Sequence, residues 1–111
     1  MPKIPQRGDL VWISMNPQAG HEQAGHRPAL VLSPGSYHGK VGLAVMCPVT
    51  GQVKGYPFEV AIPSGLPVQG VVLSDQARSL DWKVRKARFI CKLPPENTLE
   101  VLQKLGTLVN P

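Results

Sequence analysis

Short apolar runs, each ended by proline or glycine, recur along the whole chain. There are 12 prolines and 11 glycines among the 111 residues. Proline lacks the N–H that a central strand needs, and glycine favours turns, so both keep regular elements short. The runs between them are suited to strands rather than helices. We expect strands within residues 10–15, 29–32, 41–47, 58–62, 71–73 and 87–91, with the third ending at Pro48.

The last part of the chain has a different pattern. Leu99, Leu102 and Leu105 recur at helical spacing, and Pro95 suits a first helical turn. Residues 36–40 should form a turn or a short helical coil, and residues 74–79 a polar stretch. Five or six short strands and one closing helix predict a mainly β fold, a small and strongly curved antiparallel barrel with a C-terminal α-helix. The length predicts a single domain over residues 1–111.

The composition limits the partners and the setting. Twelve Lys and Arg against seven Asp and Glu give a net charge of +5, which favours an anionic partner such as nucleic acid or an acidic protein segment. Cys47 and Cys91 form no CxxC pair, so a reduced, cytoplasmic setting is expected. No stretch approaches the roughly 18 apolar residues of a membrane span, and the N-terminus lacks a signal-peptide core. We therefore expect no membrane association and no standard export.

A polar segment lies between the first two apolar runs. Residues 20–28 read GHEQAGHRP, which places an acid, two imidazoles, an amide and a guanidinium on a segment that its glycines allow to turn tightly. Arg27 could bind a phosphate with two parallel hydrogen bonds, and His26 could move a proton. Equally, Glu22 and Arg27 could form one structural ion pair in a polar surface loop, with His26 bonded to a carbonyl.

Other polar candidates lie outside this segment. Thr50 follows the third run, where its hydroxyl could face a ligand or serve only the turn, and Asp75 lies in a polar loop. A dense basic set lies near the end of the chain and consists of Lys83, Arg85, Lys86, Arg88 and Lys92. It could follow the backbone of single-stranded nucleic acid or be a solvated face. The histidines and acids lack metal-site spacing, so no metal is expected.

These side chains suffice for one reaction without a metal. A base can remove the proton of an RNA 2′-OH, that oxygen can attack the adjacent phosphorus, and a cation can stabilise the charge that develops. DNA has no such internal nucleophile. The residues therefore favour RNA cleavage among reactions on nucleic acids.

Several motifs, in one order, resemble the MazF/PemK (Kid) family of toxin endoribonucleases. They are Gly8-Asp9-Leu10-Val11-Trp12, residues 20–34, Pro48-Val49-Thr50, residues 54–60, and Ser74-Asp75-Gln76 with Arg78-Ser79. The resemblance implies an SH3-like (CcdB/MazF-type) barrel that forms a homodimer and cleaves single-stranded mRNA at short sequence sites, with no metal or cofactor. The products would carry a 2′,3′-cyclic phosphate (or 3′-phosphate) and a 5′-hydroxyl. It also implies a MazE-like antitoxin whose acidic C-terminal tail occupies the RNA groove, and growth arrest by the unopposed toxin.

The same resemblance implies roles for individual residues. Glu22 falls on the family's base or RNA-contacting acid, Arg27 on its phosphate stabiliser and acid, and Thr50 on a phosphate contact. Some members have a catalytic arginine two positions before the aspartate, but that position is Leu73 here, so the sequence supports the Glu22-based mechanism. The secondary candidates are His26, Asp75 and Gln76. The expected RNA-binding residues are Gln23, Gln52, Lys54, Arg78, Lys83, Arg85 and Lys86.

Two non-catalytic interpretations stay open at the level of sequence. A CcdB-like gyrase poison shares the barrel, and a basic barrel could simply bind RNA. A gyrase poison needs no glutamate five positions before an arginine and near a threonine, so Glu22 and Arg27 favour the nuclease.

Overall fold

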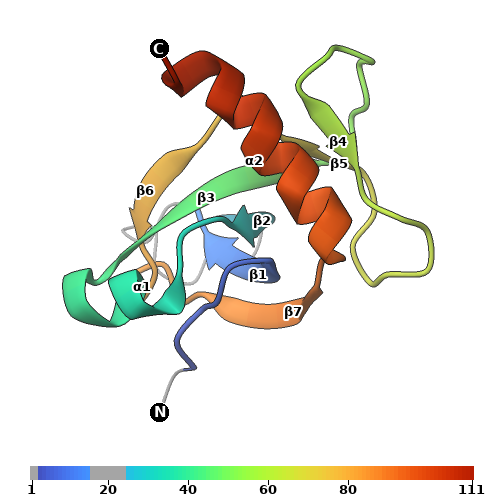
Figure 1. Cartoon of the computed structure of the whole chain (residues 1–111). Coiled ribbons are helices and arrows are strands. Elements are labelled where there is room, and N and C mark those ends of the chain that lie inside the picture. Colours follow the sequence, from blue (N-terminus) through green and yellow to red (C-terminus); the bar gives the residue numbers. More distant parts are fainter. Residues whose placement is uncertain (1–2, 16–24) are drawn as a thin grey trace.

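A computed structural model describes residues 3–15 and 25–111, which form seven strands and two helices (Figure 1). In chain order these are β1 (Asp9–Ser14), β2 (His26–Val31), α1 (Gly35–Val41), β3 (Leu43–Thr50), β4 (Glu59–Ala61), β5 (Val71–Leu73), β6 (Arg78–Asp81), β7 (Arg88–Lys92) and α2 (Pro95–Val109). The strands follow the order β4-β5-β3-β2-β1-β7, with β6 also paired to β3, and these pairs are antiparallel. The described sheet curls like a barrel without closing, which confirms the mainly β fold and its C-terminal helix.

The strand β3 changes neighbours along its length. Its first half pairs with β6 up to Met46, and its last two residues pair with β5 from Val49 onward. On the opposite edge, Pro48 pairs with Ala29 of β2. Pro48 thus falls in the gap between the β6 and β5 ladders, where no N–H has to be donated to either strand. The predicted end of the strand at Pro48 was therefore wrong.

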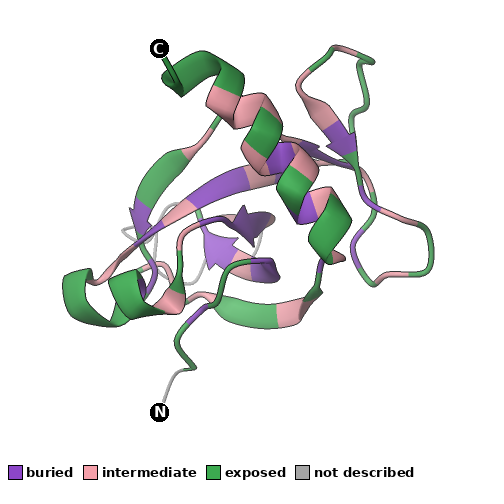
Figure 2. Ribbon diagram, viewed as in Figure 1, coloured by how far each residue is buried: buried purple, intermediate pink, exposed green. Residues whose placement is uncertain are grey.

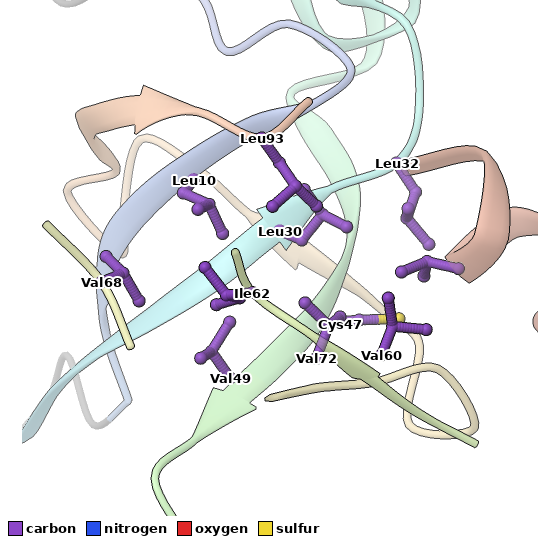
Figure 3. Packing of buried hydrophobic residues seen from close by; sticks show 11 residues of the cluster. Leu10, Leu30, Leu32, Cys47, Val49, Val60, Ile62, Val68, Val72 and Leu93 are labelled. Atoms are coloured by element: carbon purple, nitrogen blue, oxygen red, sulfur yellow. The ribbon is translucent and has the colours of Figure 1, made fainter. Parts of the chain in front are cut away.

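The sheet buries apolar side chains on both faces. On one face, Leu10 and Leu30 pack with Cys47, Val72 and other residues under α2 (Figure 3), and Val101 of the helix joins them. On the other face, Val11, Ala29, Met46 and Trp82 form a second cluster. Neighbouring residues of a strand point to opposite faces, so the apolar run of β1 feeds both clusters. Figure 2 shows the central strands buried and much of α2 exposed on its outer side.

Three elements differ from the sequence-based expectation. The strand β6 was not predicted, because only Leu80 of its four residues is buried and a single apolar residue gives no recognisable pattern. Residues 35–41 form a true helix, α1, which ends at Gly42 with a left-handed φ of 82°. The strand β2 begins at His26 rather than at Ala29, because its polar first residues pair with β1. Among the described residues, no helix is long and apolar enough to cross a membrane.

His38 is the centre of a buried polar network at the start of β3. Its Nδ1 lies 2.7 Å from the Pro5 carbonyl oxygen, and its Nε2 lies 2.5 Å from the Ser33 hydroxyl. The same hydroxyl accepts the Val45 N–H at 2.8 Å. One arrangement satisfies every group: the His38 Nδ1–H donates to Pro5 and the Ser33 O–H donates to Nε2. His38 is fully buried, so this network holds the N-terminal segment and α1 against the sheet.

Candidate active site

Arg27 and Thr50 extend from the same face of neighbouring strands. Ala29 of β2 pairs with Pro48 of β3. Arg27 lies two residues before Ala29 and Thr50 lies two residues after Pro48, so strand alternation places both side chains on the face of that pair. Continuing the antiparallel register would set Arg27 opposite Thr50. Two residues far apart in the sequence therefore lie just beyond the same end of the β2–β3 ladder.

An apolar hollow of about 150 Å³ lies on this face. Its lining consists of Ile13, Met15, Pro28, Ala29, Met46, Pro48, Gln76, Arg78 and Leu80. Ile13 pairs with Arg27 across β1 and β2, and Met46 pairs with Arg78 across β3 and β6. Directly paired residues share a face, so both arginines rise from the face that holds the hollow. An apolar floor between two guanidinium groups suits a nucleobase flanked by phosphates.

A second, polar hollow of about 120 Å³ adjoins the first through Gln76, which lines both. Its lining consists of Thr50, Gln52, Lys54, Tyr56, Glu59, Leu73 and Gln76. The Thr50 hydroxyl accepts the Gln52 N–H at 3.1 Å, so its own proton is left to donate to a ligand. Gly70 passes so close to Thr50 that a side chain at position 70 would collide with the Thr50 carbonyl group.

Two carboxylates accept hydrogen bonds from the loop that lines the polar hollow. Glu59 accepts the N–H groups of Lys54 and Gly55, each at 2.8 Å. The Tyr56 hydroxyl donates to Asp75 Oδ1, also at 2.8 Å. This hydrogen bond raises the pKa of Tyr56, and the negative charges of Asp75 and Glu59 act in the same direction.

Two of the three predicted catalytic residues, Arg27 and Thr50, are among the described residues. Glu22 and Gln23 lie outside the described residues. Arg27 is exposed, and its Nη1 donates to the His26 carbonyl oxygen at 3.1 Å. His26 pairs with Ser14, and alternation places its ring on the face opposite Arg27. The other predicted residues in and around the two hollows are Thr50, Gln52, Lys54, Asp75, Gln76 and Arg78.

The predicted basic residues between β6 and β7 have different roles. The Arg85 guanidinium donates to the carbonyl oxygens of Ser14 and Met15, at 3.0 and 3.1 Å. It therefore braces the end of β1. Lys83 and Lys86 are exposed, and the Lys83 ammonium lies 5.4 Å from the centre of the Trp82 ring. Since Met15 lines the apolar hollow, this basic turn adds positive charge beside it.

Comparison with known proteins identifies the family. A family model described as PemK-like, MazF-like toxin of type II toxin–antitoxin systems matches residues 6–109. The chain belongs to the PemK/MazF toxin family. It is 44% identical to the endoribonuclease toxin MazF of Escherichia coli K12 over 106 residues, 96% of this chain and 95% of that protein. It is 34% identical to the E. coli endoribonuclease PemK over 108 residues, 94% of this chain and 81% of that protein.

Solved structures of MazF proteins have the same fold. A crystal structure of MazF from Deinococcus radiodurans superposes with a TM-score of 0.88 and 53% identity, covering 98% of this chain and 99% of that chain. A MazE–MazF structure from the same organism gives 0.87 and 48%, covering 96% of both chains. The resemblance noted in the sequence is therefore confirmed, and this PemK/MazF toxin is an endoribonuclease rather than a non-catalytic barrel.

Sequence reasoning missed two residues of this PemK/MazF site. Tyr56 and Glu59 both lie in the motif at residues 54–60, where neither was given a role, and Glu59 also falls within the strand expected at 58–62. Their contacts span loop residues that no periodic pattern connects. The available sequence signal was Gly55, because glycine often marks a turn, and in the structure its φ is 84°.

Proposed function

We propose that this toxin cleaves single-stranded mRNA at short sequence sites, without a metal, by attack of the RNA's own 2′-hydroxyl. Arg27 and Thr50 hold the scissile phosphate, and Glu22 removes the 2′-OH proton. The observation that carries the proposal is that Arg27 and Thr50 each lie two residues beyond the Ala29–Pro48 pair of β2 and β3, on the face of that pair. A guanidinium and a hydroxyl on one face can contact two oxygens of the same phosphate.

The reaction needs no group beyond these side chains and the RNA. Glu22 takes the 2′-OH proton, the 2′-oxygen bonds to phosphorus, and the bond from phosphorus to the 5′-oxygen breaks. Arg27 stabilises the extra negative charge and serves the leaving 5′-oxygen as acid. The products are a 2′,3′-cyclic phosphate, which can open to a 3′-phosphate, and a 5′-hydroxyl. Glu22 is assigned from its motif, five positions before Arg27 in the sequence.

The RNA strand would lie over the two hollows. Its bases would contact the apolar floor around Ile13 and Met46, and Gln52, Lys54, Gln76 and Arg78 would bind base edges or phosphates. Lys83 and Lys86 would extend the positive path. Gln23 is proposed from its motif alone. His26 stays a secondary candidate for proton transfer.

We also propose that a MazE-like antitoxin inhibits the enzyme in the cytoplasm. An acidic C-terminal tail would lie in the RNA path and neutralise Arg27, Arg78 and the basic turn, which the net charge of +5 favours. The similar MazF from D. radiodurans is known in MazE–MazF structures. A homodimer follows from the family resemblance.

The test is cleavage of a labelled single-stranded RNA pool in EDTA, with chemical mapping of the product ends. We expect 2′,3′-cyclic phosphate and 5′-hydroxyl ends, and no cleavage of DNA of the same sequence. Arg27→Ala and Glu22→Gln should each lower kcat/KM about 100-fold. Lys40→Ala is the matched control for lost positive charge, since Lys40 is exposed on α1, at the far end of β3 from Thr50. A requirement for magnesium would refute the mechanism, and so would full activity of the variant that carries both Arg27→Ala and Glu22→Gln.

A further inference from the structure

We propose that Glu59 and Asp75 are positioning residues that fasten the loop between β3 and β4, residues 51–58, beside Thr50. The fastened loop then sets which base the enzyme accepts next to the scissile phosphate. The inference rests on the proposed function, because it assumes that RNA lies over the polar hollow.

Glu59 holds the loop from the side of β4. Its two carboxylate oxygens accept two successive amides, Oε2 that of Lys54 and Oε1 that of Gly55, each at 2.8 Å. The left-handed φ of Gly55 turns the backbone so that both N–H groups point to one acceptor, an arrangement that binds anions. Hydrogen bonds to a carboxylate are stronger than those to a neutral oxygen. Since Glu59 also pairs with Leu73 of β5, the loop is tied directly to the sheet.

Asp75 holds the same loop from the turn after β5. Its Oδ1 accepts the Tyr56 hydroxyl at 2.8 Å across 19 residues of sequence. The turn is closed by the Gln76 N–H, which donates to the Leu73 carbonyl oxygen at 3.1 Å. Nearby, the Ser74 N–H donates to the Phe58 carbonyl oxygen at 3.0 Å. The loop therefore has two carboxylate anchors, Glu59 on β4 and Asp75 in the turn after β5.

The anchored loop gives the hollow its shape. Its lining combines loop residues Gln52, Lys54 and Tyr56 with Thr50 of β3 and with Gln76. Its volume of about 120 Å³ suits one nucleobase, and its hydroxyl, amide and ammonium groups can hydrogen-bond to a base edge. Unpaired bases of single-stranded RNA are recognised in this way. Because a displacement of about 1 Å can be costly for a positioned group, loosening either anchor should weaken base selection.

This geometry favours a positioning role for Asp75 over a role as general base. One of its oxygens is already engaged by Tyr56, and the position two residues before it is Leu73 rather than a cation. If Asp75 acts through Tyr56, removing either side of their hydrogen bond should have the same effect. A double-mutant cycle measures such dependence.

The experiment first maps the preferred site of the wild-type enzyme in a randomised single-stranded RNA pool. Kinetics then follow on an oligonucleotide with that site and on oligonucleotides with one base replaced. Tyr56→Phe and Asp75→Ala, which remove the donor and the acceptor of the hydrogen bond, should each raise KM about tenfold and change kcat less than about twofold. The double variant should be no worse than either single one. Discrimination between the preferred and replaced sites should fall by a similar factor.

Glu59→Gln should have the larger effect on selectivity, because its amide group can accept only one of the two N–H groups. Glu96→Gln is the matched control. It makes the same change in the first turn of α2, where Glu96 is exposed. The control variant should keep wild-type kinetics and site preference.

A titration checks the contact itself. The chain has two tyrosines, so in a Tyr37→Phe background the absorbance of tyrosinate reports Tyr56 alone. Asp75→Asn should lower the raised pKa of Tyr56 towards its ordinary value. An unchanged pKa would remove the contact on which the inference depends.

The kinetic outcomes distinguish two failures. If the wild-type enzyme cleaves no RNA, the proposed function and this inference both fail. If it cleaves RNA but the effects of Tyr56→Phe and Asp75→Ala add, or Asp75→Ala alone abolishes cleavage of every RNA, only the positioning role is wrong. An unchanged site preference in Glu59→Gln would also show that the positioning role is wrong while the proposed function stands.

Discussion

Two polar networks lie at opposite ends of β3 and use the same kinds of hydrogen bond. At its start, His38, Ser33 and the Val45 amide form a chain that is closed within the buried interior. At its end, Thr50 and the loop held by Glu59 border two open hollows. In the first network the groups satisfy one another, whereas in the second the Thr50 hydroxyl accepts one N–H and keeps its own proton to donate. The two ends of β3 therefore differ less in residue type than in whether a hydrogen-bonding group beside a hollow can still bind a ligand.

The largest expected effect comes from breaking the buried network. His38→Ala would leave the Pro5 carbonyl and the Ser33 hydroxyl without their partner and open a cavity. An unpaired buried group costs about 1–3 kcal/mol, so we expect a loss of about 3–4 kcal/mol in the free energy of unfolding. Urea denaturation measures this. The fraction of molecules that stays folded should cleave RNA at the wild-type rate, and a selective loss of cleavage with normal stability would contradict the structural role.

The second effect falls on catalysis at the other end of β3. Thr50→Val keeps the shape of the side chain but removes the hydroxyl, so kcat/KM should fall about 100-fold, or about 2.7 kcal/mol of transition-state stabilisation. The melting temperature should change little, because Thr50 is only half-buried. Thr50→Ser, which restores the hydroxyl, is the control and should recover most of the activity. Equal loss in both variants would indicate that packing, not the hydroxyl, matters.

The sequence predicts the parts of this fold that rest on local patterns. The strand at 71–73 and the C-terminal helix follow from apolar runs and helical spacing, and both are present. The strand β6 and the continuation of β3 past Pro48 depend on partners distant in the sequence, which no local pattern contains. In the candidate site, Arg27 and Thr50 stand in recognisable motifs. The role of Tyr56 depends on Asp75, 19 residues away, so it became visible only when the chain was folded.

Cys47 lies between the two networks on β3 and gives an effect that is absent near neutral pH and grows only in alkaline solution. Burial raises the pKa of its thiol from 9.0 to about 12, and the nearby Asp75 adds to the shift. Between these values the unfolded chain loses the thiol proton while the folded protein keeps it, so stability falls as pH rises. The expected slope is about 1.4 kcal/mol per pH unit. It is measured as the difference between the wild-type protein and Cys47→Ala in urea denaturation at pH 9 to 11. An equal slope in both proteins would show that the thiol does not stay protonated, and that the middle of β3 is more open to solvent than its buried start.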